Sequence, residues 1–182
     1  WNYSLMEEKR PGQFFPVEED GRGTYLYNSK DMCMIEHVPE LIKAGITSFK
    51  IEGRNKTAYY AACVTGAYRA AIDTYKKDPE NFVLPQFCRD EVNKVSHREY
   101  YTGFYFGNQE NGQHYGDSQY IREYEVVGMP VECDDSGKAV FALKNRFFDG
   151  EELELIQPGQ APYVFRAENV TDDEGTKREL FN

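Results

Sequence analysis

A short run of alternating side chains constrains the fold of this chain more than any other feature. The apolar Phe49 and Ile51 alternate with the charged Lys50 and Glu52, and this two-residue period is typical of a β-strand with one buried face. A pattern with helical spacing starts directly after Gly53-Arg54, so residues 46–75 are predicted to form a strand, a tight turn and a helix. The apolar positions of that helix are Tyr60, Val64, Ala67, Ala71 and Tyr75.

The preceding residues repeat the same order of elements. Residues 24–27 are predicted to form a strand, and a helix is expected from Pro39 to Gly45, since proline suits a first turn and glycine a helix end. Residues 24–75 therefore predict a βαβα run with parallel strands and a right-handed crossover. Two strands do not close a barrel, so we expect the last βαβα portion of a β/α (TIM-type) barrel, with most of the barrel upstream of Trp1.

The pattern changes after Asp78-Pro79, which divides the chain into three predicted parts. Residues 1–77 are assigned to the barrel portion with an N-terminal hairpin, and residues 78–119 to a linker with a short helix and an aromatic and polar loop. Residues 120–182 are assigned to a small antiparallel β-barrel whose closing strand is expected to be missing. The strands expected there are 123–128, 131–133, 139–143, 151–156 and 163–170.

Charged residues follow both predicted parallel strands. Lys30 and Asp31 end one strand–loop junction, and Lys50, Glu52 and Arg54 end the next. The ends of neighbouring barrel strands meet at one mouth, where lysine and arginine bind phosphate or carboxylate groups and the acids orient them or transfer protons. These five residues are the candidate catalytic set. A structural ion-pair network, or a solvated strand face, is the alternative.

A local basic segment also predicts a small RNA contact. The whole chain has a net charge of −10, which excludes broad, non-specific nucleic-acid affinity, yet residues 41–77 hold seven basic and two acidic residues. Arg54, Lys56 and Tyr59 are the candidate RNA-binding residues, with aromatic help from residues 100–106. A solvated helix face would give the same count of charges.

The remaining motifs exclude some classes of protein. No apolar run reaches the length of about 20 residues that a membrane helix needs, and the sequence has neither HExxH nor GxSxG. The three histidines, His37, His97 and His114, give no confident triad. The four cysteines lack CxxC spacing, so free thiols and a cytoplasmic location are expected. Cys33 is a candidate metal ligand near the predicted mouth, with a buried inert thiol as the alternative.

Several segments, in order along nearly the whole chain, carry a family resemblance. They are residues 7–12 (EEKRPG), 28–33 (NSKDMC), 49–54 (FKIEGR), 95–98 (VSHR) and 102–107 (TGFYFG). Together they resemble the peptidase U-32 family, also called collagenase-like proteases. The resemblance implies an N-terminal β/α barrel followed by a small β-barrel extension, which agrees with the two patterns above.

Two activities attach to that resemblance. Older naming makes the family peptidases of unknown catalytic type, whereas one branch supports hydroxylation of the wobble uridine of tRNA, and related proteins carry an iron–sulfur cluster on cysteines. The resemblance to the tRNA-hydroxylating branch is the stronger, which implies tRNA as a partner. The cysteine-rich segment that precedes the tryptophan in such proteins is absent here, so Cys33 alone holds no cluster and no cofactor is expected in this piece. A genuine protease and a non-catalytic RNA- or protein-binding module remain the alternatives.

The chain starts with Trp1 rather than Met, and we expect it to be a C-terminal fragment. An incomplete barrel leaves unpaired strand edges and apolar faces, so the fragment alone is expected to be inactive, less stable and prone to self-association.

Overall fold

The computed structural model describes residues 3–6, 8–9, 11–12, 14–21, 23–25, 29–107 and 120–182. It divides into two compact units, each built from two stretches of the chain. The first unit comprises Trp1–Met34 and His97–Ile121, and the second comprises Ile35–Ser96 and Arg122–Asn182. Residues 108–119, which include His114 and all but the last residue of the polar loop predicted at 108–120, lie outside the described residues.

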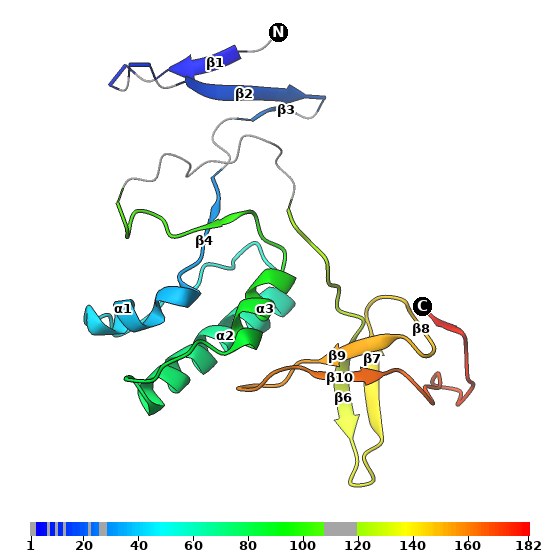
Figure 1. The fold of residues 1–182 in the computed structure, drawn as a ribbon. Helices are drawn as coiled ribbons and strands as arrows, with labels where there is room; N and C mark the ends of the chain where they lie inside the picture. The colour runs from blue at the N-terminus through cyan, green and yellow to red at the C-terminus, as the bar shows by residue number, and fades with distance from the viewer. Residues whose placement is uncertain are drawn as a thin grey trace. The chain divides into compact units, whose positions relative to one another are not determined.

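The first unit contains a three-stranded antiparallel sheet (Figure 1). Its strands, in the order β1-β2-β3, are β1 (Tyr3–Met6), β2 (Phe14–Asp20) and β3 (Gly23–Tyr25). The predicted N-terminal hairpin is confirmed, with Tyr3 opposite Val17. Of the strand expected at 24–27, residues 24 and 25 lie in β3, which pairs antiparallel with β2, and residues 26 and 27 lie outside the described residues. Strand β3 therefore does not have the parallel neighbour that the βαβα prediction gave it.

The parallel pairing of the first unit lies elsewhere. Strand β4 (Asp31–Met32) pairs in parallel with β5 (Tyr100–Tyr101), which brings together residues almost seventy positions apart in the sequence. Two further backbone bonds extend this pairing, from the Asp31 N–H to the Glu99 carbonyl and from the Cys33 N–H to the Tyr101 carbonyl, at 3.0 and 2.9 Å.

The second unit is built around helices. They are the 3₁₀ turn η1 (Ile35–His37) and the helices α1 (Val38–Lys43), α2 (Ala58–Lys77) and α3 (Gln86–Lys94). The predicted helix ending at Gly45 is confirmed, and Gly45 has a left-handed φ of 83° that glycine tolerates best. Helix α2 begins at the N-cap Thr57, whose side chain accepts the Tyr60 N–H at 3.2 Å. Its apolar stripe faces α3 and α1, as the helical spacing predicts.

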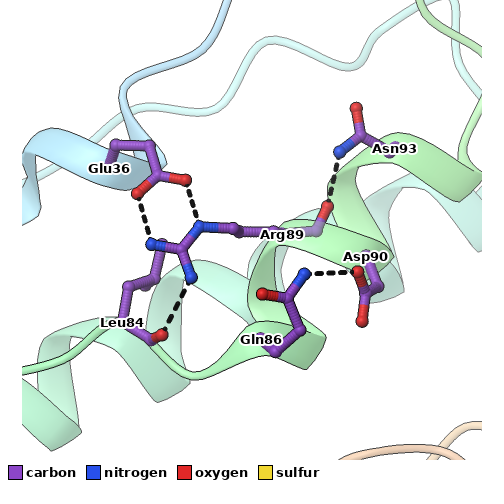
Figure 2. A network of polar contacts seen from close by, with 6 residues as sticks. All are labelled: Glu36, Leu84, Gln86, Arg89, Asp90 and Asn93. Carbon is purple, nitrogen blue, oxygen red and sulfur yellow. Dashed lines mark hydrogen bonds and ion pairs between the residues drawn. The ribbon is translucent and has the colours of Figure 1, made fainter.

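Hydrogen bonds of Arg89 link α3 to Glu36 at the start of the helical region (Figure 2). The Arg89 guanidinium donates to both carboxylate oxygens of Glu36, at 2.5 and 2.8 Å, and to the Leu84 carbonyl at 3.1 Å. These hydrogen bonds to Glu36 are the main reason why the pKa of Arg89 is raised. A bidentate pair of this kind fixes orientation, so this charged cluster has a structural role.

The strand predicted at 46–52 is not formed, which corrects the expectation. No ladder hydrogen bonds involve these residues within the part of the chain that the structure describes, although their burial alternates as predicted: Phe49 and Ile51 are half-buried and Lys50 and Glu52 exposed. The physical reason is that the burial period records only which side faces the core, whereas a strand also needs a hydrogen-bonding neighbour. The β/α-barrel origin of this region stays a prediction.

The C-terminal residues form three separate antiparallel pairs (Figure 1). The strands are β6 (Gly128–Cys133) with β7 (Ala139–Leu143), β9 (Glu152–Leu155) with β10 (Tyr163–Arg166), and β8 (Phe147–Phe148) with β11 (Leu180–Phe181). The expected strands within 131–133, 139–143, 151–156 and 163–170 are thus present at least in part. The strand expected at 123–128 is wrong, because only Gly128 joins a strand, and the short β8 and β11 were not predicted. A closed barrel stays a prediction, as does the division at residues 77 and 119.

A small core supports these pairs. Phe147 on β8 stacks on Phe181 of β11 with ring centroids 4.9 Å apart, and Ala167 is buried beside them. None of the described helices is long and apolar enough to cross a membrane.

Candidate functional site

The turn between the predicted strand and helix α2 is held by its own backbone and by Tyr60. The Glu52 carboxylate accepts the Arg54 N–H at 3.0 Å, and the Gly53 carbonyl accepts the Lys56 N–H at 2.9 Å. The Tyr60 hydroxyl donates to the Glu52 carbonyl at 3.4 Å, and a Cβ on Gly53 would lie 3.3 Å from the Tyr60 ring. Glycine at position 53 therefore lets the turn lie directly against α2.

This turn presents cations of two kinds. Lys50 and Arg54 are exposed. Lys56 is partly buried: its ammonium donates to the Ser96 carbonyl at 2.8 Å and lies 5.3 Å from the centroid of the Tyr60 ring. Lys50 and Arg54 thus have the exposure that a phosphate contact needs, whereas Lys56 also holds the turn against Ser96, two residues after the end of α3.

Tyr59, the third candidate RNA-binding residue, packs inward. It contacts the buried cluster of Cys63, Val64 and Val95, and burial is the main cause of the raised pKa of its phenol. Its placement is that of a core residue with a polar tip, and its part in RNA binding stays a prediction.

Lys30 and Asp31 lie in the first unit, beside β5. The Lys30 ammonium is paired with the Glu99 carboxylate at 2.6 Å, and the Asp31 carboxylate accepts the Arg98 N–H at 3.1 Å. Both side chains thus stabilise the β4–β5 pairing, which matches the structural alternative considered for them. Lys50, Glu52 and Arg54 belong to the second unit, so the proposed meeting of the two groups at one mouth stays a prediction.

Ser96 is followed by His97, one of the three histidines considered for a triad, and by Arg98, which the sequence marks only as part of the VSHR motif. His97 is buried, its Nδ1–H donates to the Arg98 carbonyl at 2.6 Å, and its ring stacks on Tyr100 at 4.2 Å. Arg98 donates to the Ser29 carbonyl at 2.8 Å and to the Tyr120 hydroxyl at 3.1 Å. These contacts join the ends of the first unit's two chain segments, and they give His97 a structural role.

An aromatic turn follows β5. Phe104, Tyr105 and Phe106 have exposed fractions of 76, 57 and 55%. Gly103 has a φ of 64° and lies so close to Met32 that a Cβ would meet the Met32 sulfur at 2.9 Å, which anchors the base of the turn on β4. The spacing TGFYFG, with a glycine at each end of three aromatics, was the sequence signal for this feature.

The cysteines occupy different environments, and all four are free thiols. Burial raises the pKa of Cys63 to about 12 and that of Cys88 to about 11, so both are protonated thiols. Cys133 is exposed, and Cys33 is half-buried beside β5. Within the described ranges no three His, Cys, Asp or Glu side chains are arranged to hold a metal ion. These residues do not fit an iron–sulfur cluster, and we derive no chemistry through one; a ligand role for Cys33 stays a prediction.

Comparison with known proteins decides the family. The model of Peptidase family U32 matches residues 1–115, and that of the Peptidase family U32 C-terminal domain matches residues 122–181. The chain belongs to peptidase family U32. The resemblance of the five motifs is thereby confirmed.

U32 relatives with curated names fall into two groups. The chain is 33% identical to the tRNA hydroxylation protein P1 of Bacillus subtilis and 34% identical to the tRNA hydroxylation protein P of Escherichia coli, over 97 and 95% of its length. It covers 42 and 38% of those proteins, so it spans about two fifths of their length. It is also 24% identical over 158 residues to a protein named collagenase from Porphyromonas gingivalis. No solved structure matches this U32 chain.

Proposed function

We propose that this protein acts in the hydroxylation of tRNA, at the wobble uridine. The observation that carries the proposal is its similarity to two tRNA hydroxylation proteins over almost its whole length, at 33 and 34% identity. We also propose a cytoplasmic location, because tRNA is found there and thiols stay reduced there.

The charge distribution supports a tRNA contact at the Glu52–Arg54 turn. Residues 41–77 hold seven basic residues (Lys43, Lys50, Arg54, Lys56, Arg69, Lys76 and Lys77) against two acidic ones, within a chain of net charge −10. The acidity of the rest of the chain disfavours phosphate binding there and so favours this segment. At its centre, Glu52 holds the Arg54 backbone in place by a hydrogen bond, so the exposed Arg54 side chain starts from a fixed turn. We propose that Lys50 and Arg54 bind tRNA phosphates.

The aromatic turn 103–107 supports a second contact, with unpaired bases. Exposed Phe and Tyr rings stack on bases for about 1–3 kcal/mol each. Unpaired loop bases are the parts of a folded RNA that protein rings can reach. We propose that this turn stacks on bases of the tRNA, independently of the phosphate contacts.

The contacts of the five proposed site residues distinguish their roles. These residues are Lys30, Asp31, Lys50, Glu52 and Arg54. Glu52 and Asp31 each accept a backbone N–H and so act first as positioning groups. The Lys30 ammonium is engaged by Glu99. Lys50 and Arg54 are therefore the members we assign to substrate binding.

Proteolysis is the second candidate, because the collagenase of Porphyromonas gingivalis and a protein of Methanocaldococcus jannaschii named "Uncharacterized protease MJ0090" are also similar to this chain. The two buried thiols argue against a cysteine nucleophile at those positions, since catalytic cysteines have a lowered pKa and these have a raised one. Cleavage of denatured collagen by the purified protein is the assay that would favour proteolysis.

A salt titration of tRNA binding tests the proposal. The affinity of the protein for tRNA is measured at several salt concentrations for the wild type, for Lys50→Ala and for Arg54→Ala. Arg69→Ala is the matched control, because Arg69 belongs to the same basic segment but is paired with Asp73 one turn along α2. Each lost phosphate contact should weaken binding and reduce the slope of log affinity against log salt by about 0.7–0.9.

The control should leave both affinity and slope unchanged. Equal slopes for the wild type and both turn variants would mean that the basic segment is a solvated helix start, and the proposed contact would be wrong. Binding that follows this pattern fits both tRNA hydroxylation and a non-catalytic RNA-binding module, and hydroxylation by the whole protein distinguishes the two.

A further inference from the structure

Lys94, the last residue of α3, joins the helices to the C-terminal strands. Its side chain is only 14% exposed, and its ammonium bonds the Glu91 carboxylate on α3 at 2.9 Å and the Glu154 carboxylate on β9 at 2.5 Å. The same ammonium lies 5.1 Å from the centroid of the Tyr124 ring. One cation thus connects α3 with two parts of the chain that match the U32 C-terminal domain.

The surroundings of this cation are poor in water. The Glu91 side chain is 6% exposed, and burial, followed by the nearby Glu91 carboxylate, raises the pKa of the Cys63 thiol to about 12. Burial alone would lower the pKa of Lys94, but its bonds to Glu154 and Glu91 outweigh that effect and raise it. Charges held in such a setting depend on one another, because a buried carboxylate without its partner is strongly unfavourable.

The two residues after Lys94 make contacts of other kinds. Val95 is fully buried in the cluster with Cys63 and Val64, against which Ile51 also packs. The Ser96 carbonyl accepts the Lys56 ammonium at 2.8 Å. Three consecutive residues therefore contact strand β9, the helical core and the turn that carries Arg54.

We propose that the C-terminal domain sets the position of the Glu52–Arg54 turn through residues 94–96. The ion pair between Lys94 and Glu154 makes the connection to that domain. The Glu154 carboxylate fixes the end of α3, Val95 fixes the start of the following segment in the core, and Ser96 fixes Lys56. Breaking the ion pair between Lys94 and Glu154 then weakens the hydrogen bonds of the turn. This coupling does not depend on the tRNA proposal, because its parts are contacts within the second unit.

Amide hydrogen exchange in the full chain tests the coupling. The reporters are the backbone N–H groups of Arg54 and Lys56, which are bonded to Glu52 and Gly53. Glu154→Gln leaves the Lys94–Glu91 pair intact and should speed exchange at both reporters by about threefold, and Lys94→Met should do so by about tenfold. Glu152→Gln is the matched control, because Glu152 is exposed on the same strand, and it should leave both rates unchanged.

Unchanged exchange at Arg54 and Lys56 in the Glu154→Gln protein would overturn the proposal, whatever happens to exchange within β9. An equal acceleration by Glu152→Gln would overturn it too, because the effect would then follow from a lost surface charge. If Lys94→Met fails to fold, the comparison of Glu154→Gln with Glu152→Gln still decides.

Discussion

Truncating Val95 to alanine should cost much more stability than the same change at an exposed valine. Val95 is fully buried in the cluster with Cys63 and Val64. The change removes two buried methyl groups, at about 0.8 kcal/mol each, and the cavity left behind adds roughly 1 kcal/mol, for a total of about 2–3 kcal/mol. The matched control is Val83→Ala, because Val83 is 75% exposed and should change the free energy of unfolding by less than about 0.5 kcal/mol.

Equilibrium urea unfolding, followed by helical circular dichroism, is the assay. It reports on the second unit, since every helix in the part of the chain that the structure describes lies there. Val95→Ala should lower the urea midpoint without changing the slope. A cost below about 1 kcal/mol, or a cost equal to that of Val83→Ala, would refute the placement of Val95 in a packed core.

Further predictions concern thiols, turns and glycines. A thiol reagent at mildly alkaline pH should label Cys133 rapidly, but Cys63 and Cys88 only on unfolding, because burial raises their pKa to about 12 and about 11; equal labelling rates would contradict the structure. Hydrogen bonds from Ser136 lower the pKa of Asp134, and hydrogen bonds from Thr176 lower that of Asp172. The stability that these hydrogen bonds contribute is therefore present above the unfolded-state pKa of about 3.9, and it is lost as the pH falls through the lower folded-state pKa. Asp134→Ala should therefore abolish the acid-induced change in the Ser136 amide resonance and leave that of Glu174 intact, and a persisting Ser136 transition would argue against this bond. Gly66→Ala, inside α2 with open space around it, should stabilise the second unit by about 0.5–1 kcal/mol. Gly53→Ala should destabilise it, because its Cβ would lie 3.3 Å from the Tyr60 ring, and a stabilising Gly53→Ala in urea unfolding would contradict the close approach.

Features set by local physics were predictable from the sequence. Helix α2 follows from its apolar spacing, and the helix end at Gly45 follows from the left-handed angle that glycine tolerates. The N-terminal hairpin and the β6–β7 hairpin follow from turn residues between alternating segments.

Features set by distant partners were not predictable. The β4–β5 pair joins two-residue strands from far apart in the chain, and so short a strand has no readable period. Residues 49–52 have the burial alternation of a strand but no ladder, because periodicity does not reveal a neighbour.

The candidate site, like the fold, was predictable only in part. The exposed Lys50 follows from its alternation with Phe49 and Ile51, and the exposed Arg54 follows from its place in the predicted turn. The inward packing of Tyr59 and the bonds of Lys94 depend on α3 and β9, which approach only in the folded chain. Charge patterning identifies a basic segment, but it does not tell which of its cations are already engaged.

The proposed role of this chain in tRNA hydroxylation can be tested in cells. The most direct measurement is the amount of hydroxylated wobble uridine, by mass spectrometry, in tRNA from an Escherichia coli strain that lacks its tRNA hydroxylation protein P. The strain carries a chimera of that protein in which this chain replaces the segment to which it is similar. We expect that the chimera restores the hydroxylated nucleoside, that Arg54→Ala in the chimera lowers it, and that Arg69→Ala does not. A chimera that is folded and abundant but leaves the uridine unmodified would contradict the claim.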